Sequence, residues 1–277
     1  MTWTHRELEA RVAAHGRGHR AGSPSGLELK RFRCELDAAL HASQVHRVLV
    51  LGMTPELRGL VLDSSAVLVS MDVNPEAIRL YVDWVPQNSA ETILEENWLS
   101  LDRARHGYFG AILGDGILPN LLTETEQRKL ISRMAACLAT GGAVIMRHPI
   151  LPDSEDLRAM YWKDLCRRLR SGNIDPDGYG LTMRLWGFAQ ELGVLEDGVL
   201  DNKAVFERLA TLLEQAEISE QEHDYVQRFR YLGHNLFFDL HALEGMTRDA
   251  GLTMADHKVS EGFWNSYYRM LTLKCVQ

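Results

Sequence analysis

Two residues whose types suit ligand binding stand at the ends of short apolar runs. Gly52 follows the run 48–51, and Asp72 follows the run 67–71, about 20 residues further along the chain. Glycine lets the main chain approach a ligand closely, and a carboxylate can accept hydrogen bonds from the two hydroxyls of a ribose. The pair therefore predicts a site for a nucleoside-containing cofactor.

Six further candidate residues follow other apolar runs. They are Asn97, Trp98, Asp115, Gly116, Arg147 and His148. His148 is a candidate general base because imidazole titrates near neutral pH, although a substrate anchor and a structural histidine are alternatives. Asp115 would either position an amine or hydrogen-bond the cofactor. Arg147 would either bind a substrate carboxylate or form an ion pair with a nearby acid.

The apolar runs predict the strands of a parallel sheet, because continuous apolar segments are typical of strands buried on both faces. They lie at 48–51, 67–71, 92–94, 108–113 and 143–146. Helix-start signals alternate with them: Pro55, Asn74 before Pro75, and Thr123 with Glu126. This order predicts a doubly wound α/β sheet with right-handed crossovers. In such a sheet, ligands bind beyond the carboxyl ends of the strands.

The remaining segments flank or interrupt this alternation. The expected domains are a helical N-terminal segment (1–44), a cofactor-binding core (45–149 and 236–277) and a helical insertion (150–235). Strands near 252–260 and 267–275 complete the core. The insertion follows the fifth strand on the substrate side, so it is expected to act as a substrate lid.

The insertion carries a second group of candidate residues. Tyr231 and His234, where the insertion rejoins the core, form an alternative catalytic cluster to His148. Tyr179 and Asn235 are candidate substrate contacts. The competing explanation is that most aromatic side chains here form the insertion's own core.

Composition excludes several classes of function. The chain has 30 Lys and Arg against 38 Asp and Glu, a net charge of -8 with no basic run, which argues against a nucleic-acid partner. No apolar run approaches the roughly 20 residues of a membrane helix, so no membrane partner is expected. The polar N-terminus lacks the apolar stretch of a signal peptide, and a cytoplasmic location is expected. The four cysteines form no Cys-x-x-Cys pair, and no metal site is predicted.

Five segments, in order, resemble successive motifs of the class I S-adenosylmethionine-dependent methyltransferases. They are VLVLGMTPEL (48–57), VSMDVNPE (69–76), ENW (96–98), ILGDGIL (112–118) and GGAVI (141–145). The resemblance covers 46–149 well and 236–277 moderately. It implies a Rossmann-like, mostly parallel, seven-stranded sheet with an antiparallel C-terminal edge, accompanied by the helical N-terminal segment and the helical lid.

The resemblance also implies S-adenosylmethionine as cofactor and S-adenosylhomocysteine as product. It assigns the methionine part to Gly52, Met53 and Thr54, the ribose to Asp72 and Val73, the adenine to Asn97 and Trp98, and the sulfonium to Asp115 and Gly116. The first loop departs from the family, because a single glycine replaces the usual two or three. The assignment therefore rests on the ordered set of motifs.

Two other functions stay open. An NAD(P)-dependent reductase would use Asp72 in the same way, but it needs Gly-x-Gly-x-x-Gly after the first strand, and 52–57 does not supply it. Glu56 would also repel a phosphate at the helix start. A methyltransferase-like module that binds cofactor or a partner without catalysis is the second alternative.

The expected activity is methyl transfer to an oxygen or nitrogen of a small molecule, by direct displacement and in specialised metabolism. The acidic surface and the insertion favour a small-molecule acceptor in an enclosed site. The N-terminal helices would either cover that site or form a homodimer.

Overall fold

The computed structural model describes residues 22–86, 90–102, 105–257, 259 and 267–276. These residues form two compact units. We call them the sheet unit (within 24–149, 240–260 and 268–277) and the helical unit (150–239 with 22–23 and 267). The helix expected at 3–14 lies outside the described residues.

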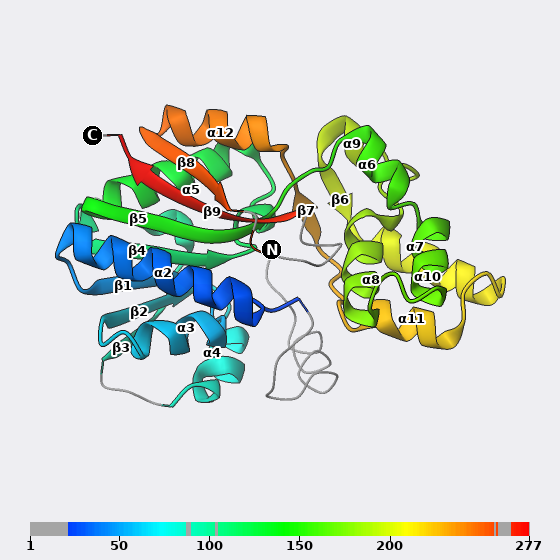
Figure 1. The fold of residues 1–277 in the computed structure, drawn as a ribbon, viewed down its shortest axis with the longest axis horizontal. Coiled ribbons are helices and arrows are strands. Elements are labelled where there is room, and N and C mark those ends of the chain that lie inside the picture. Colours follow the sequence, from blue (N-terminus) through cyan, green and yellow to red (C-terminus); the bar gives the residue numbers. More distant parts are fainter. Residues whose placement is uncertain (1–21, 87–89, 103–104, 258, 260–266, 277) are drawn as a thin grey trace. The chain divides into compact units, whose positions relative to one another are not determined.

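The sheet unit contains a seven-stranded sheet with the strand order β3-β2-β1-β4-β5-β9-β8 (Figure 1). Its strands are β1 (Arg47–Leu51), β2 (Val67–Asp72), β3 (Glu91–Glu95), β4 (Phe109–Asp115), β5 (Leu138–Pro149), β8 (Leu252–His257) and β9 (Tyr268–Cys275). The first five pair in parallel, whereas β9 is antiparallel to both β5 and β8. The expected doubly wound sheet with an antiparallel edge is confirmed. The carboxyl ends of β2, β1 and β4 are consequently neighbours.

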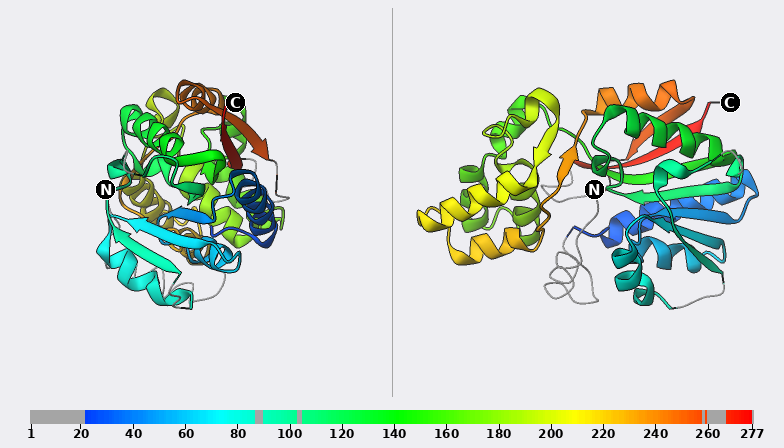
Figure 2. Two further views of the ribbon diagram at one scale, coloured as in Figure 1. Left: turned by 90° about the vertical axis from the view of Figure 1, so that its left-hand side faces the viewer. Right: turned by 180° about the vertical axis from the view of Figure 1, so that it is seen from behind.

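Helices cover both faces of this sheet (Figure 2). The helices are α2 (Gly26–Ser43), α3 (Pro55–Leu62), α4 (Pro75–Tyr81), α5 (Glu124–Cys137) and α12 (Leu240–Asp249), with short 3-10 turns at Val82–Trp84, Trp98–Ser100 and Leu118–Asn120. α2 and α3 lie on one face, and α5 and α12 lie on the other. Proline at the start of α3 and of α4 suits a first turn that needs no N–H donor there.

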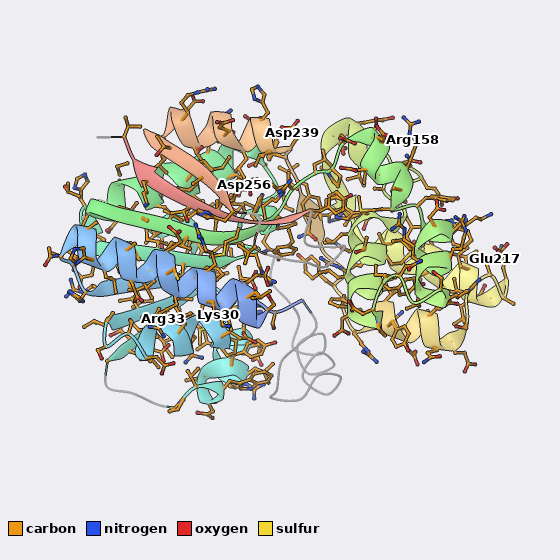
Figure 3. The ribbon with its side chains drawn as sticks, in the orientation of Figure 1. Lys30, Arg33, Arg158, Glu217, Asp239 and Asp256 are labelled. Atoms are coloured by element: carbon orange, nitrogen blue, oxygen red, sulfur yellow. The ribbon has the colours of Figure 1, made fainter. Side chains whose placement is uncertain are left out.

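Helix α2 is part of the sheet unit, which differs from the separate N-terminal segment expected for 1–44. Its Phe32, Leu36 and Leu40 are buried in the core on one face of the sheet. Its polar side carries Lys30 and Arg33, labelled in Figure 3. The apolar stripe of α2 can be buried only against the sheet, so the helix cannot stand apart from it.

The start of β5 also differs from the sequence pattern, which predicts that α5 ends at Gly141 and Gly142. The helix ends at Cys137, and β5 begins at Leu138. The glycines instead allow close main-chain packing. A Cβ on Gly141 would lie 2.7 Å from the Ala42 carbonyl oxygen, and one on Gly142 would lie 2.8 Å from the Gly110 carbonyl oxygen.

The helical unit is an assembly of short helices with one two-stranded sheet. Its elements are α6 (Ser154–Ala159), α7 (Trp162–Arg170), α8 (Pro176–Thr182), a π-helix (Met183–Gly187), α9 (Val194–Asp197), β6 (Val199–Asp201), α10 (Asn202–Glu214), α11 (Glu220–Gln227) and β7 (His234–Leu236). Its core includes Trp186 and Phe237, whose ring centroids are 4.8 Å apart. Of all the helices in the described part of the chain, none is long and apolar enough to cross a bilayer.

Candidate cofactor and substrate sites

Three predicted cofactor residues meet at the carboxyl ends of β1 and β2. Gly52 has a φ of +89°, and the Cβ that it lacks would lie 3.9 Å from Oδ2 of Asp72 and 4.0 Å from Cζ2 of Trp98. Only glycine adopts this backbone conformation without strain. The missing side chain therefore leaves a space bordered by a carboxylate, an indole and the main chain.

One carboxylate oxygen of Asp72 accepts a hydrogen bond from the main chain, and the other faces this space. Its Oδ1 accepts a hydrogen bond from the Asn74 N–H (2.8 Å), which fixes the carboxylate at the start of α4. Oδ2 is the oxygen nearest Gly52. Burial raises the pKa of Asp72, while hydrogen bonds from the main chain of Asn74 and Val73 oppose that shift. A desolvated carboxylate of this kind gains strongly from a ligand's hydroxyl donors.

Trp98 is anchored to the same strand end. Its indole N–H donates a hydrogen bond to the Met71 carbonyl (2.8 Å), and Gly52 N–H donates to the same oxygen (2.8 Å). Val73, next to Asp72, leaves 43% of its surface exposed. An indole and an exposed valine suit the face of a flat heterocycle.

The other residues of these two loops have local roles. Asn97 is exposed and caps the 3-10 turn by accepting a hydrogen bond from Leu99 N–H (2.8 Å). Met53 is buried, with 4% of its surface exposed. Thr54 precedes α3 and makes no side-chain capping bond.

A buried ionic cluster occupies the carboxyl ends of β4 and β5. Arg147 donates two hydrogen bonds to Asp115, from Nε to Oδ1 (2.8 Å) and from Nη2 to Oδ2 (2.9 Å). It donates a third to Oε2 of Glu28 on α2 (3.1 Å). Arg147 is fully buried. Of the two roles considered for Arg147, this geometry favours the ion pair over contact with a substrate carboxylate.

An unpredicted residue, Tyr268, completes the cluster. Its ring stacks on the Arg147 guanidinium, with the centroid 4.5 Å from Cζ. Its hydroxyl lies 2.6 Å from the Cβ position that Gly116 lacks. Gly116 has a φ of +60°, and its N–H donates to the Arg147 carbonyl (2.8 Å). Any side chain at Gly116 would collide with the Tyr268 hydroxyl.

His148 points away from this cluster, because successive strand residues face opposite sides of a sheet. Its side chain is buried, and within the described residues neither ring nitrogen has a hydrogen-bond partner. Burial lowers the pKa of His148 to about 3. At neutral pH the imidazole is therefore uncharged and weakly basic, which argues against the general base and leaves the substrate anchor and the structural histidine as alternatives.

The second predicted cluster comes together around β7 in the helical unit. His234 leaves 41% of its side chain exposed, and its Nε2 lies 3.8 Å from Oδ2 of Asp201 on β6. The Tyr231 hydroxyl donates to the His234 carbonyl (3.5 Å). An exposed imidazole beside a carboxylate suits a general base better than a buried imidazole does.

The two predicted substrate contacts in the helical unit are both buried. Oδ1 of Asn235 accepts a hydrogen bond from Nδ2 of Asn202 (3.0 Å). Tyr179 packs among α7, α8 and α11, with its hydroxyl 3.5 Å from Sγ of Cys166 and its ring edge-on to Tyr225. This geometry favours a structural role for Tyr179, as the competing explanation held.

Sequence reasoning overlooked Glu28 and Tyr268. Glu28 forms a capping box with Ser25, and the sequence Ser-Gly-Leu-Glu is a recognisable signal for it. No local sequence signal indicates the contact of Glu28 with Arg147, which is 119 residues away. In the described part of the chain, no group of three or more His, Cys, Asp or Glu residues could hold a metal ion.

Comparisons with known proteins agree on the fold. No protein-family model matches the sequence. No curated protein matches it either. Among solved structures, the CcbJ methyltransferase of Streptomyces caelestis has a TM-score of 0.57 at 12% identity, covering 99% of this chain and 100% of that one. The N-methyltransferase NodS of Bradyrhizobium japonicum, solved with S-adenosyl-L-homocysteine, has a TM-score of 0.53 at 14% identity and covers both chains completely.

A third structure, named as a zinc-dependent alcohol dehydrogenase from Rhodobacter sphaeroides, has a TM-score of 0.58 at 15% identity and covers 98% of both chains. At these identities the likeness concerns the fold alone. The sheet order and the antiparallel edge are those of the class I methyltransferase fold.

Proposed function

We propose that this protein is an S-adenosylmethionine-dependent methyltransferase that methylates an oxygen or nitrogen atom of a small molecule. The observation that carries the proposal is the meeting of Gly52, Asp72 and Trp98 around one space at neighbouring strand ends. Its carboxylate suits a ribose diol, and its indole and the exposed Val73 suit an adenine. NodS, an N-methyltransferase of similar fold solved with S-adenosyl-L-homocysteine, supports the choice of cofactor.

The residues fit a nucleoside without a phosphate. In the first loop, Pro55 removes one N–H donor from the start of α3, and Glu56 adds a negative charge there. A pyrophosphate would need those donors and would be repelled by that charge. This favours S-adenosylmethionine over a nicotinamide dinucleotide.

When bound, S-adenosylmethionine supplies an activated methyl group that a nucleophile displaces directly. The protein's residues would align the acceptor, exclude water and accept a proton where the acceptor releases one. In this proposal, neutral His148 holds the acceptor by a hydrogen bond. The net charge of -8 supports a small-molecule acceptor over nucleic acid.

Calorimetric titration with S-adenosylmethionine, S-adenosylhomocysteine, NADH and NADPH tests the proposal. Saturable binding of the two sulfur nucleosides alone is expected. Binding of a nicotinamide nucleotide instead would refute it, and binding of none would favour a non-catalytic module.

Asp72→Ala tests the ribose assignment in the same titration. It should weaken binding about tenfold or more, because charge-assisted hydrogen bonds contribute about 1.5–3 kcal/mol. Asp63→Ala is the matched control, since Asp63 carries the same charge at the other end of α3 and its side chain is 80% exposed. Equal affinity for the Asp72→Ala variant and the control would remove Asp72 from the site.

A further inference from the structure

Among the residues that the structure describes, the ionic cluster at the carboxyl ends of β4 and β5 has more negative than positive side chains. It contains two carboxylates, Asp115 and Glu28, and one guanidinium, that of Arg147, so its formal charge is -1. The side chains of Arg147, Glu28 and Asp115 are 0%, 2% and 12% exposed. Little water reaches this charge to screen it.

No second cation balances the cluster among the residues that the structure describes. In the described part of the chain, Oε2 of Glu28 accepts one hydrogen bond from Arg147 and one from the Ser25 N–H (2.7 Å), the latter within the capping box of α2. The main-chain dipoles at the start of α2 offset part of this charge, but they add no full positive charge. Asp115 is the most exposed of the three side chains, so it is the member of the cluster that solvent or a ligand can reach.

The sheet order puts this charge beside the proposed cofactor site. Asp72 ends β2, Gly52 follows β1 and Asp115 ends β4, and these three strands are consecutive neighbours. Adjacent strands lie about 4.8 Å apart, so the ends of β2 and β4 are separated by about 10 Å. A nucleoside whose ribose binds Asp72 can extend its 5′ substituent across Gly52 toward Asp115.

We infer that Glu28 is a specificity-determining residue, which makes the site favour the cationic sulfonium of S-adenosylmethionine over the neutral thioether of S-adenosylhomocysteine. Asp115 alone would be neutralised by Arg147, and Glu28 supplies the excess negative charge. The selection helps the product to leave, because methyl transfer removes the positive charge that the cluster attracts. This inference rests on the proposed function, since it takes the cofactor to be S-adenosylmethionine.

The test compares the affinities of Glu28→Gln for three ligands by calorimetry: S-adenosylmethionine, S-adenosylhomocysteine, and an analogue with an ammonium group in place of the sulfonium. The two cations should bind about tenfold more weakly than to the wild type, because the variant removes one buried negative charge from the cluster that attracts them. The neutral thioether should change less than twofold. Glu35→Gln is the matched control, because Glu35 is on the same helix and pairs with Arg31 (2.7 Å) outside the cluster.

Glu28 also caps α2, so Glu28→Gln could fail to fold, and a second variant tests the inference without changing this cap. Asp115→Asn brings the cluster to the same formal charge without touching the cap, and it should shift the ratio of the two affinities in the same direction. An unchanged ratio in the folded variant, or an equal shift in the control, overturns the inference. Failure of the wild type to bind either sulfur nucleoside would instead overturn the proposed function.

Discussion

Replacing His148 by leucine should stabilise the folded protein, although the residue is buried in a strand of the sheet. Its side chain is 1% exposed, and neither ring nitrogen has a hydrogen-bond partner among the described residues. A buried polar atom without a partner costs about 1–3 kcal/mol. Leucine has a similar volume and no polar atom, so His148→Leu should raise the free energy of unfolding by about 1–2 kcal/mol at pH 7.

The same substitution should reduce the acid sensitivity of the protein. Burial lowers the pKa of His148 to about 3, whereas an unfolded histidine has a pKa of about 6.5. Above pH 6.5 the imidazole is neutral in both states and adds no pH dependence. Between pH 6.5 and 3 the unfolded chain binds a proton that the folded protein excludes, so stability falls as the pH falls, by about 1.4 kcal/mol per pH unit.

Urea unfolding followed by circular dichroism at pH 7, 6 and 5 measures both effects. The advantage of His148→Leu over the wild type should grow by about 2 kcal/mol between pH 7 and pH 5. All other titrating groups are shared, so they cancel in this difference. His41→Leu, at an exposed position on α2, controls for the substitution itself. Parallel pH profiles for His148→Leu and the wild type would refute the reasoning.

Two further predictions concern the space beside Asp72 and a buried ion pair within the sheet unit. Gly52→Ala should lower the free energy of unfolding by about 1 kcal/mol, because φ is +89° at this position. It should also weaken S-adenosylmethionine binding, because the new Cβ would enter the space beside Asp72. Unchanged affinity in calorimetry would place the ligand elsewhere. Arg58→Met should cost about 3–5 kcal/mol in urea unfolding, since it leaves Glu91, held at 2.7 Å, as an unpaired buried charge. Adding Glu91→Met should restore most of that loss, and a double variant as unstable as the single one would contradict this account.

Most of the parallel part of the sheet was predictable because β1, β2, β4 and the middle of β5 are buried on both faces. Such strands appear in the sequence as unbroken apolar runs, and the polar or glycine residue after each run marks the carboxyl end. The proximity of Gly52, Asp72 and Trp98 follows from this regularity, since adjacent parallel strands end at one edge. The candidate site at β1 and β2 could therefore be predicted without knowing any long-range contact.

The remaining features depend on contacts that local patterns do not encode. Nothing near Arg147 indicates that it pairs with Glu28, because the partner comes from a helix 119 residues earlier. The sequence pattern predicts a helix end at Gly141. In the structure this glycine instead allows β5 to pack closely against the main chain at Ala42. The lowered pKa of His148 arises from burial, which is a property of the completed fold.

Strand β5 gives an argument for the functional edge that does not depend on any resemblance. Its middle, Ala143 to Met146, is apolar and buried, as a strand between two helical layers should be. At its carboxyl end the same strand carries Arg147 and His148, equally buried and facing opposite sides. Among the described residues, Arg147 is the cation of a cluster with two carboxylates, and His148 has two nitrogens without hydrogen-bond partners. Apolar residues would be more stable at both positions. Polar groups kept at such a cost at the end of β5 beside the first two loops support the proposal that the site lies at this edge of the sheet.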